Sequence, residues 1–300
     1  MKQQIQTFMR DHHLSQVALA KKLSISESAI SQYLAGKYPN PETIEMKFTD
    51  LFEKEELRQT VTNVEDIPFA MTTIAEQVMK TLEYARIKRN ISVIYGDAGV
   101  GKTRSLEEWS KGKTDIVRLT AAPALGNPKS FFKYLARELK TVRGGNIDDL
   151  YLDICDRLTG SDKVIVIDEA QHLTLKTLEN LRGIQETANI ALVLIGNETI
   201  YTKMVGRQQA EFAQLFSRIG WRKHLMTDQF VLGDVQKVFG AQTENEPARL
   251  LLDICHSKYG LRGAIHVFVN AANNADISAK GIRAMARSMG ITLKGGVAVG

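Results

Sequence analysis

The chain has 300 residues, of which 44% are hydrophobic and 24% are charged, and its formal net charge is +5. This composition is typical of a soluble chain of two or three domains, and no apolar run approaches the roughly 20 residues that span a bilayer. Because residues 1–6 also lack the apolar core of a signal peptide, we expect a cytoplasmic protein with no membrane partner. The two cysteines stand far apart in the chain and have no paired spacing, so the sequence suggests neither a disulfide framework nor a zinc site.

Residues 1–60 are predicted to form an all-α unit that ends in a charged helix at residues 42–58. Ser15 and Ser26 each stand where they can cap a short helix. Ala20 provides the small side chain that two crossing helices need where they touch. This is a helix-turn-helix pattern, and through Ser-Gln-x-x-Leu-Ala and Ile-Ser-x-Tyr-Leu-x-Gly it resembles the repressor family of phage regulators.

The resemblance implies that the second helix of the pair enters the major groove of DNA with its first residues against the bases. The side chains that it assigns to DNA are Gln16, Ser28, Ser31 and Gln32, with Glu27 beside them. The alternative is a three-helix packing module that binds no DNA, because the eight basic side chains of residues 1–60 are balanced by eight acidic ones.

A phosphate-binding loop is predicted at residues 96–103, after a polar linker at residues 59–68 and a helix at residues 69–90. Residues 91–95 predict a strand and residues 104–110 a helix, so the glycines and the Lys-Thr pair stand between a strand and a helix. Backbone N–H groups of such a loop converge on phosphate oxygens at the positive end of the helix dipole. We therefore expect ATP or GTP to bind to Gly96, Asp97, Ala98, Gly99, Val100, Gly101, Lys102 and Thr103, with the Thr103 hydroxyl as a ligand of Mg²⁺.

The loop opens an α/β domain that we expect at residues 61–225, followed by a helical lid at residues 226–300. Further strands are predicted at 115–119, 163–169 and 190–195, a polar helical segment at 207–219, and four short helices between 232 and 289. Strands that alternate with helices predict a parallel sheet whose ligand lies at the carboxyl ends of the strands. Asp168 and Glu169 end one buried strand, where the first acid would hold Mg²⁺ through water and the second would deprotonate the attacking water.

Together these motifs resemble the AAA+ ATPases, a P-loop fold with a parallel sheet and a helical lid. The resemblance implies that Asn197 touches the γ-phosphate and the attacking water. It also implies that Arg218 is an arginine finger acting on the ATP of a neighbouring subunit, and that Arg262 senses nucleotide from the lid. From the residues alone, the alternatives are that Asn197 caps the following helix and that Arg218 forms a surface salt bridge.

The order of the motifs narrows the resemblance to the B proteins of transposing bacteriophages of the Mu type. After the helix-turn-helix, it is carried by Gly-Asp-Ala-Gly-Val-Gly-Lys-Thr, Val-Ile-Asp-Glu-Ala-Gln-His-Leu, Leu-Arg-x-Ile-Gln-Glu-Thr, Val-Leu-Ile-Gly-Asn and Glu-Phe-Ala-x-Leu-Phe-Ser-Arg-Ile. It implies an ATPase with ATP and Mg²⁺ as cofactors that binds duplex DNA without sequence preference and assembles on it as a helical filament. Such proteins deliver target DNA to the transposase of the same element and stimulate strand transfer, here in the cytoplasm of a bacterial host.

Position and charge alone assign three further contacts with the DNA backbone, at Lys129, Arg143 and Arg207. Two other functions stay open. One is a transcription regulator whose AAA+ module gates a sequence-specific helix-turn-helix, and the other is a helicase loader or initiator.

Overall fold

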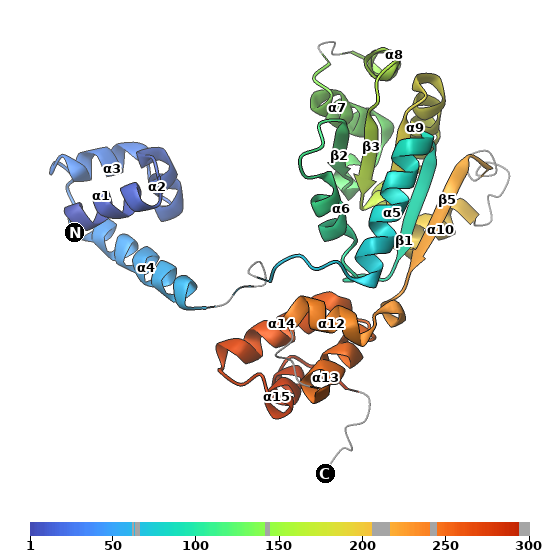
Figure 1. Ribbon diagram of the computed structural model, residues 1–300. Coiled ribbons are helices and arrows are strands. Elements are labelled where there is room, and N and C mark those ends of the chain that lie inside the picture. The colour runs from blue at the N-terminus through green and yellow to red at the C-terminus, as the bar shows by residue number, and fades with distance from the viewer. Residues whose placement is uncertain (62, 64–66, 142–144, 206–216, 241–244, 294–300) are drawn as a thin grey trace. The chain divides into compact units, whose positions relative to one another are not determined.

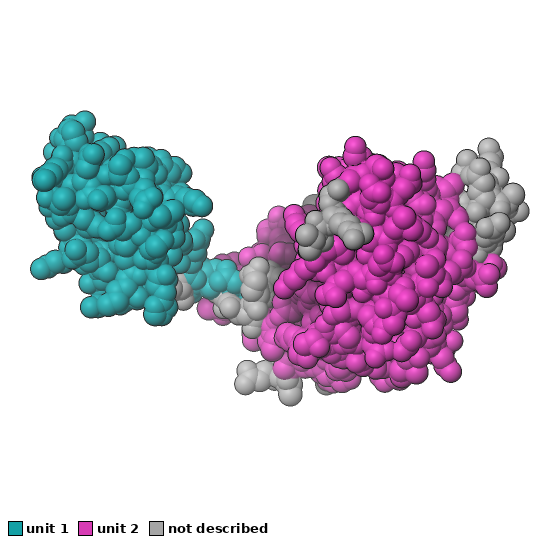
Figure 2. Space-filling view, turned by 90° about the horizontal axis from the view of Figure 1, so that it is seen from above, with its two compact units in different colours: residues 1–63 teal, residues 64–300 magenta. Residues whose placement is uncertain are grey.

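The computed structural model describes residues 1–61, 63, 67–141, 145–205, 217–240 and 245–293. The contacts within the chain separate it into two units, residues 1–63 and residues 64–300, which Figure 2 colours separately. The expected boundary between residues 225 and 226 lies inside the second unit and stays a prediction. No helix of the described residues is long and apolar enough to cross a membrane.

The first unit consists of four helices, as its sequence pattern predicts (Figure 1). They are α1 (Lys2–Asp11), α2 (Gln16–Leu23), α3 (Glu27–Leu34) and α4 (Pro41–Thr60). Ser15 Oγ accepts a hydrogen bond from the Ala18 N–H at 3.1 Å, and Ser26 Oγ accepts one from the Ala29 N–H at 3.2 Å. Both expected caps are therefore present. The helices enclose a core of fully buried side chains that includes Ile5, Leu19, Ile30, Ile44 and Phe48.

The second unit is built on a five-stranded parallel sheet with the strand order β2-β3-β4-β1-β5. The strands are β1 (Ile91–Gly96), β2 (Ile116–Thr120), β3 (Val164–Asp168), β4 (Ala191–Ile195) and β5 (Ile219–Leu225). Every residue of β1, β3 and β4 is buried, because helices cover both faces of the sheet. Buried parallel strands require continuous apolar runs, which is why these three could be predicted.

Strand β5 corrects the sequence interpretation, which ended a polar helix at Ile219 and expected no element before residue 232. Ile219 is instead the first residue of an edge strand that pairs with β1. An edge strand has only one hydrogen-bonded neighbour, so its outer positions face water and its sequence carries no apolar run. Trp221 is 46% exposed, and Arg222 is also exposed. Most of the helix expected at 207–219 lies outside the described residues.

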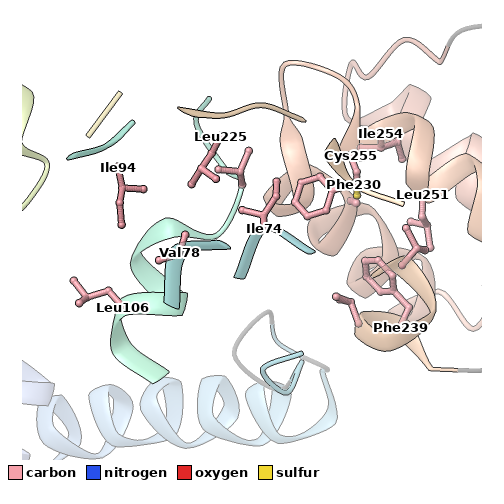
Figure 3. Close-up of a cluster of buried hydrophobic side chains, with 14 of the residues drawn as sticks. Ile74, Val78, Ile94, Leu106, Leu225, Phe230, Phe239, Leu251, Ile254 and Cys255 are labelled. Atoms are coloured by element: carbon pink, nitrogen blue, oxygen red, sulfur yellow. The ribbon is translucent and has the colours of Figure 1, made fainter. Parts of the chain in front are cut away.

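Two clusters of buried side chains attach the helices to the sheet. One cluster joins one face of the sheet to α7 (Pro128–Glu138), α8 (Ile147–Leu158), α9 (Leu175–Ala188) and α10 (Glu198–Val205). The other joins the opposite face to α5 (Thr73–Lys88), α6 (Lys102–Ser110) and the C-terminal helices. Figure 3 shows side chains of this second cluster, among them Ile74, Leu106 and Leu251.

Four helices at the C-terminal end, where the sequence predicts a lid, continue the second cluster. They are α12 (Leu232–Phe239), α13 (Asn245–Cys255), α14 (Gly260–Asn273) and α15 (Ala279–Ser288). Helix α5 begins later than expected, at Thr73, where Thr72 Oγ1 accepts a hydrogen bond from the Ala75 N–H at 3.1 Å. Residues 69–72 are therefore not helical.

Candidate nucleotide-binding site

The loop between β1 and α6 lies between the end of β5 and the residues that precede α14. Gly96, Gly99 and Gly101 all have positive φ angles, of 134°, 74° and 97°. A Cβ on Gly96 would lie 1.9 Å from the Leu225 carbonyl oxygen, and one on Gly99 would lie 2.8 Å from the Tyr259 carbonyl oxygen. At Gly101 there is open space, so only the left-handed backbone requires glycine there. The loop can take this course only with glycines at these positions.

Lys102, the first residue of α6, turns its ammonium group back over the loop. Its Nζ donates hydrogen bonds to the Gly96 carbonyl oxygen at 3.0 Å and the Asp97 carbonyl oxygen at 2.6 Å. Burial lowers the pKa of this amine, while the negative charges of Asp168 and Glu169 oppose the shift. A desolvated cation beside the N-terminus of a helix favours the binding of an anionic ligand.

Thr103 and Asp168 bring two oxygen ligands together below the loop. Thr103 Oγ1 donates a hydrogen bond to Asp168 Oδ2 at 2.6 Å, and Asp168 is only 4% exposed. Burial raises the pKa of the Asp168 carboxyl, while the Thr103 hydrogen bond and the Lys102 charge act in the opposite direction. A hydroxyl beside a buried carboxylate fits Mg²⁺, which prefers oxygen ligands and takes few of them from the protein. No group of three or more histidine, cysteine or acidic side chains that could hold a metal occurs among the described residues.

Glu169 and Asn197 face the pocket from the ends of two neighbouring strands. The Glu169 N–H donates to Asp168 Oδ1 at 2.9 Å, and its backbone is left-handed, with a φ of 55°. Asn197 Oδ1 accepts a hydrogen bond from the Thr199 N–H at 2.9 Å, so this side chain does cap the start of α10. A residue that sequence reasoning missed connects the two: Gln171 Nε2 donates to Glu169 Oε2, and Gln171 Oε1 accepts from the Asn197 N–H at 3.2 Å.

These residues lie around a pocket of about 410 Å³ whose lining is part polar and part apolar. Residues 98–103 of the predicted loop line it together with Glu169 and Asn197, whereas Gly96 and Asp97 are not among the described residues that line it. The apolar side chains of the lining include Ile67, Phe69, Ala70, Val238, Leu261 and Ile265. A nucleoside triphosphate combines a flat apolar base with a charged tail, and a lining of both kinds fits it.

The contribution of residues 67–70 to the pocket was also missed by sequence reasoning. The stretch was interpreted as the end of a linker and the start of a helix. The apolar Ile-Pro-Phe-Ala sequence of residues 67–70 could have indicated this contribution, because a fully solvated linker is typically polar.

Arg262 lies at the pocket, whereas Arg218 does not. The Arg262 N–H donates to the Gly99 carbonyl oxygen at 3.0 Å, and Arg262 lines the pocket from α14. Arg218 is not among the described residues that line the pocket. Its side chain is 63% exposed, and its Nε lies 3.0 Å from Glu186 Oε1 in the surface salt bridge that was the alternative interpretation.

The predicted DNA contacts lie on exposed surfaces or outside the described residues. Gln16 on α2 and the polar residues of α3 are exposed, namely Glu27, Ser28, Ser31 and Gln32. Lys129 is exposed near the start of α7. Arg143 and Arg207 lie outside the described residues.

Two family models match the chain, "AAA domain" at residues 86–204 and "Helix-turn-helix" at residues 5–46. The Mu-like prophage FluMu DNA transposition protein B of Haemophilus influenzae is 32% identical over 264 residues, which are 85% of this chain and 90% of the relative. This chain belongs to the Mu-like transposition protein B family. The ATP-dependent target DNA activator B of Escherichia phage D108 is 29% identical, over 90% of this chain and 87% of the relative.

Solved structures of other proteins share the fold of this chain. Cdc6p from Pyrobaculum aerophilum superimposes with a TM-score of 0.54 at 16% identity, covering 74% of this chain and 68% of that chain. At this identity the likeness shows the fold alone. The predicted fold is thereby confirmed as an AAA+ P-loop fold preceded by a helix-turn-helix unit, and the protein is an ATPase that binds ATP.

Proposed function

We propose that this protein uses ATP and Mg²⁺ to control its binding to target DNA, which it delivers to the transposase of its own element. The observation that carries the proposal is the pocket that joins the glycine loop to Glu169 and Asn197, in a chain whose relatives include an ATP-dependent target DNA activator. The work of the protein is then to select target DNA and to stimulate strand transfer in the cytoplasm of the bacterial host.

The chemistry proposed for the pocket is hydrolysis of the terminal phosphate bond. Lys102 and the loop N–H groups bind phosphate oxygens, and Thr103 and Asp168 hold Mg²⁺, the latter through water. Mg²⁺, when bound, neutralises the charge of the phosphate groups. Glu169 takes the proton from the attacking water, and Asn197 orients that water. Arg262 reports from the lid whether nucleotide is bound, which is supported by its backbone hydrogen bond to Gly99.

DNA binding is proposed to depend on the phosphate backbone and to ignore base sequence. Lys129, Arg143 and Arg207 are the candidate phosphate contacts, and the exposed polar face of α2 and α3 is the candidate contact of the helix-turn-helix unit. Cations that neutralise several phosphates in each subunit make affinity fall steeply with salt for any DNA.

Arg218 is proposed to act on the ATP of the next subunit in a filament. Its exposure leaves it accessible to a neighbour, and its salt bridge with Glu186 keeps the guanidinium at the surface of the free chain. A surface salt bridge of this kind contributes under about 1 kcal/mol, so a neighbour's phosphate can replace the carboxylate as its partner.

Mixing two inactive variants tests this proposal. Arg218→Ala should bind ATP normally but lose DNA-stimulated hydrolysis and filament formation, while Lys102→Ala should lose nucleotide binding. In a mixture, the arginine of a Lys102→Ala subunit can complete the site of an Arg218→Ala subunit. We expect the mixture to recover part of the DNA-stimulated ATPase activity that neither variant has alone.

Glu186→Gln is the matched control, because it removes the salt bridge with Arg218, together with the one that Glu186 forms with Arg182, but leaves Arg218 in place. We expect this variant to keep DNA-stimulated hydrolysis. If Arg218→Ala and Glu186→Gln behave alike and mixing restores nothing, Arg218 is only a partner in a surface salt bridge and the subunit contact proposed here is wrong.

A further inference from the structure

The side-chain amide of Gln171 lies between two groups to which the hydrolysis mechanism assigns different tasks. Gln171 belongs to a short 3₁₀ turn, Ala170–His172, that follows Glu169 directly. Its Nε2 donates a hydrogen bond to the Glu169 carboxylate, and its Oε1 accepts one from the Asn197 N–H at 3.2 Å. The amide therefore links the ends of β3 and β4 at the pocket, which all three residues line.

Gly196 leaves the room that this link needs. A Cβ on Gly196 would lie 2.6 Å from Gln171 Oε1 and 3.2 Å from the Ile200 Cγ2 methyl group. The backbone of Gly196 does not have a positive φ angle, so its conformation alone does not require glycine. A side chain at this position would instead displace the Gln171 amide from its place beside the backbone.

The chemistry of an amide suits this position. Gln171 is neutral and offers a donor on one side and an acceptor on the other, which matches a carboxylate and a backbone N–H. Glu169 is an exposed side chain, and nothing in its left-handed backbone fixes where its carboxylate points. A donor that holds one carboxylate oxygen fixes the direction of the other, and proton transfer depends on that direction.

We propose that Gln171 is a positioning residue that aims the Glu169 carboxylate at the attacking water and ties it to the backbone turn at Asn197. This inference rests on the proposed role of Glu169 as the base. Gln171 itself makes no contact with substrate in this proposal, and it acts through Glu169. Replacing it should therefore slow hydrolysis without weakening the binding of ATP.

The first experiment compares Gln171→Ala with Gln171→Glu in the full-length protein. Gln171→Ala should lower kcat by between about tenfold and a hundredfold, with KM little changed. The dissociation constant for ATP, measured by fluorescence titration with a labelled analogue, should stay within about twofold. Gln171→Glu keeps the acceptor for the Asn197 N–H but places a second negative charge against Glu169, so it should lose at least as much kcat. A wild-type rate for Gln171→Glu, or a loss of ATP affinity as large as the loss of rate, would overturn the inference.

A double-mutant cycle with Glu169→Gln separates this inference from the proposed function. Glu169→Gln alone should lower kcat by about a hundredfold or more while ATP still binds. Adding Gln171→Ala to it should lower kcat by less than about threefold, because the carboxylate that Gln171 positions is already absent. If the second substitution costs the same factor in both backgrounds, Gln171 acts independently and the inference fails. If Glu169→Gln hydrolyses ATP at the wild-type rate, the proposed base itself is wrong.

Gly196→Ala tests the close approach, and Gln185→Ala controls for loss of structure. Gly196→Ala should lower kcat in the wild-type background and lower it less when Gln171 is already alanine, because the clash with the amide is gone. Equal losses in the two backgrounds would contradict the proposal. Gln185 is a buried glutamine that donates to the Arg89 and Ile190 carbonyl oxygens, both at 3.0 Å. Gln185→Ala should lower the melting temperature but leave kcat unchanged. Gln171→Ala should lower kcat but leave the melting temperature unchanged.

Discussion

The two units of the chain present their candidate functional residues in opposite ways. In residues 1–63, the polar side chains assigned to DNA are exposed on regular helices whose core lies behind them. In residues 64–300, the candidate site depends on left-handed glycines, a left-handed Glu169 and the buried charge of Asp168. The first site consists of exposed side chains on regular helices, and the second depends on a backbone conformation that the surrounding fold imposes.

This difference predicts how each site responds to mutation. Substitutions on an exposed helical surface change binding and leave stability nearly constant. Substitutions in a loop with positive φ angles and close backbone contacts change stability as well as binding. In the glycine loop of the ATPase unit, function and folding therefore depend on the same residues, and in the helix-turn-helix unit they can be separated.

The largest expected effect is on Gly96, compared with Gly101 in the same loop. Gly96→Ala should destabilise the ATPase unit by at least about 3 kcal/mol, because its Cβ would collide with the Leu225 carbonyl oxygen and its φ is positive. Gly101→Ala should cost only about 1–2 kcal/mol, because the Cβ has open space and the only penalty is the left-handed backbone conformation. Urea unfolding followed by tryptophan fluorescence reports on this unit alone, since both tryptophans of the chain lie in it. Equal losses for the two variants would show that close packing around the loop is unimportant.

The smallest expected effect is on the exposed face of the helix-turn-helix unit. Replacing Gln16, Ser28, Ser31 and Gln32 by alanine should change stability by less than about 0.5 kcal/mol at each position. Ser26→Ala, which removes the cap of α3, should cost about 1 kcal/mol and serves as the matched control. We expect the four alanines to weaken DNA binding and to leave DNA-independent ATP hydrolysis unchanged. Unchanged affinity for DNA would identify the unit as a packing module that does not bind DNA.

Local sequence patterns predicted the parts of the fold that depend on neighbouring residues. The serine caps at Ser15 and Ser26, the strand–loop–helix at residues 91–110 and the two acids at the end of β3 are all encoded within a few positions. Residues that are distant in the sequence determine what the patterns missed. Strand β5 is polar because it lies at an edge, and residues 67–70 become part of a pocket only when the lid packs nearby.

Gln171 illustrates the same limit inside the candidate site. Its position two residues after Glu169 was visible in the sequence, but the partner that gives it meaning is the backbone of Asn197, 26 residues further on. Arg218 is a different case, because its proposed partner belongs to another subunit. The sequence pattern suggested that role, and the structure of one chain supplies only its salt bridge with Glu186.

The measurement that tests the central claim most directly is electron microscopy of the protein on long duplex DNA of random sequence, with and without ATP. The claim is that nucleotide in the pocket controls DNA binding that ignores sequence. With ATP, we expect continuous filaments along the DNA, and without ATP or in Lys102→Ala we expect bare DNA. Equal coverage with and without ATP, or protein confined to one discrete site on the DNA, would contradict the claim.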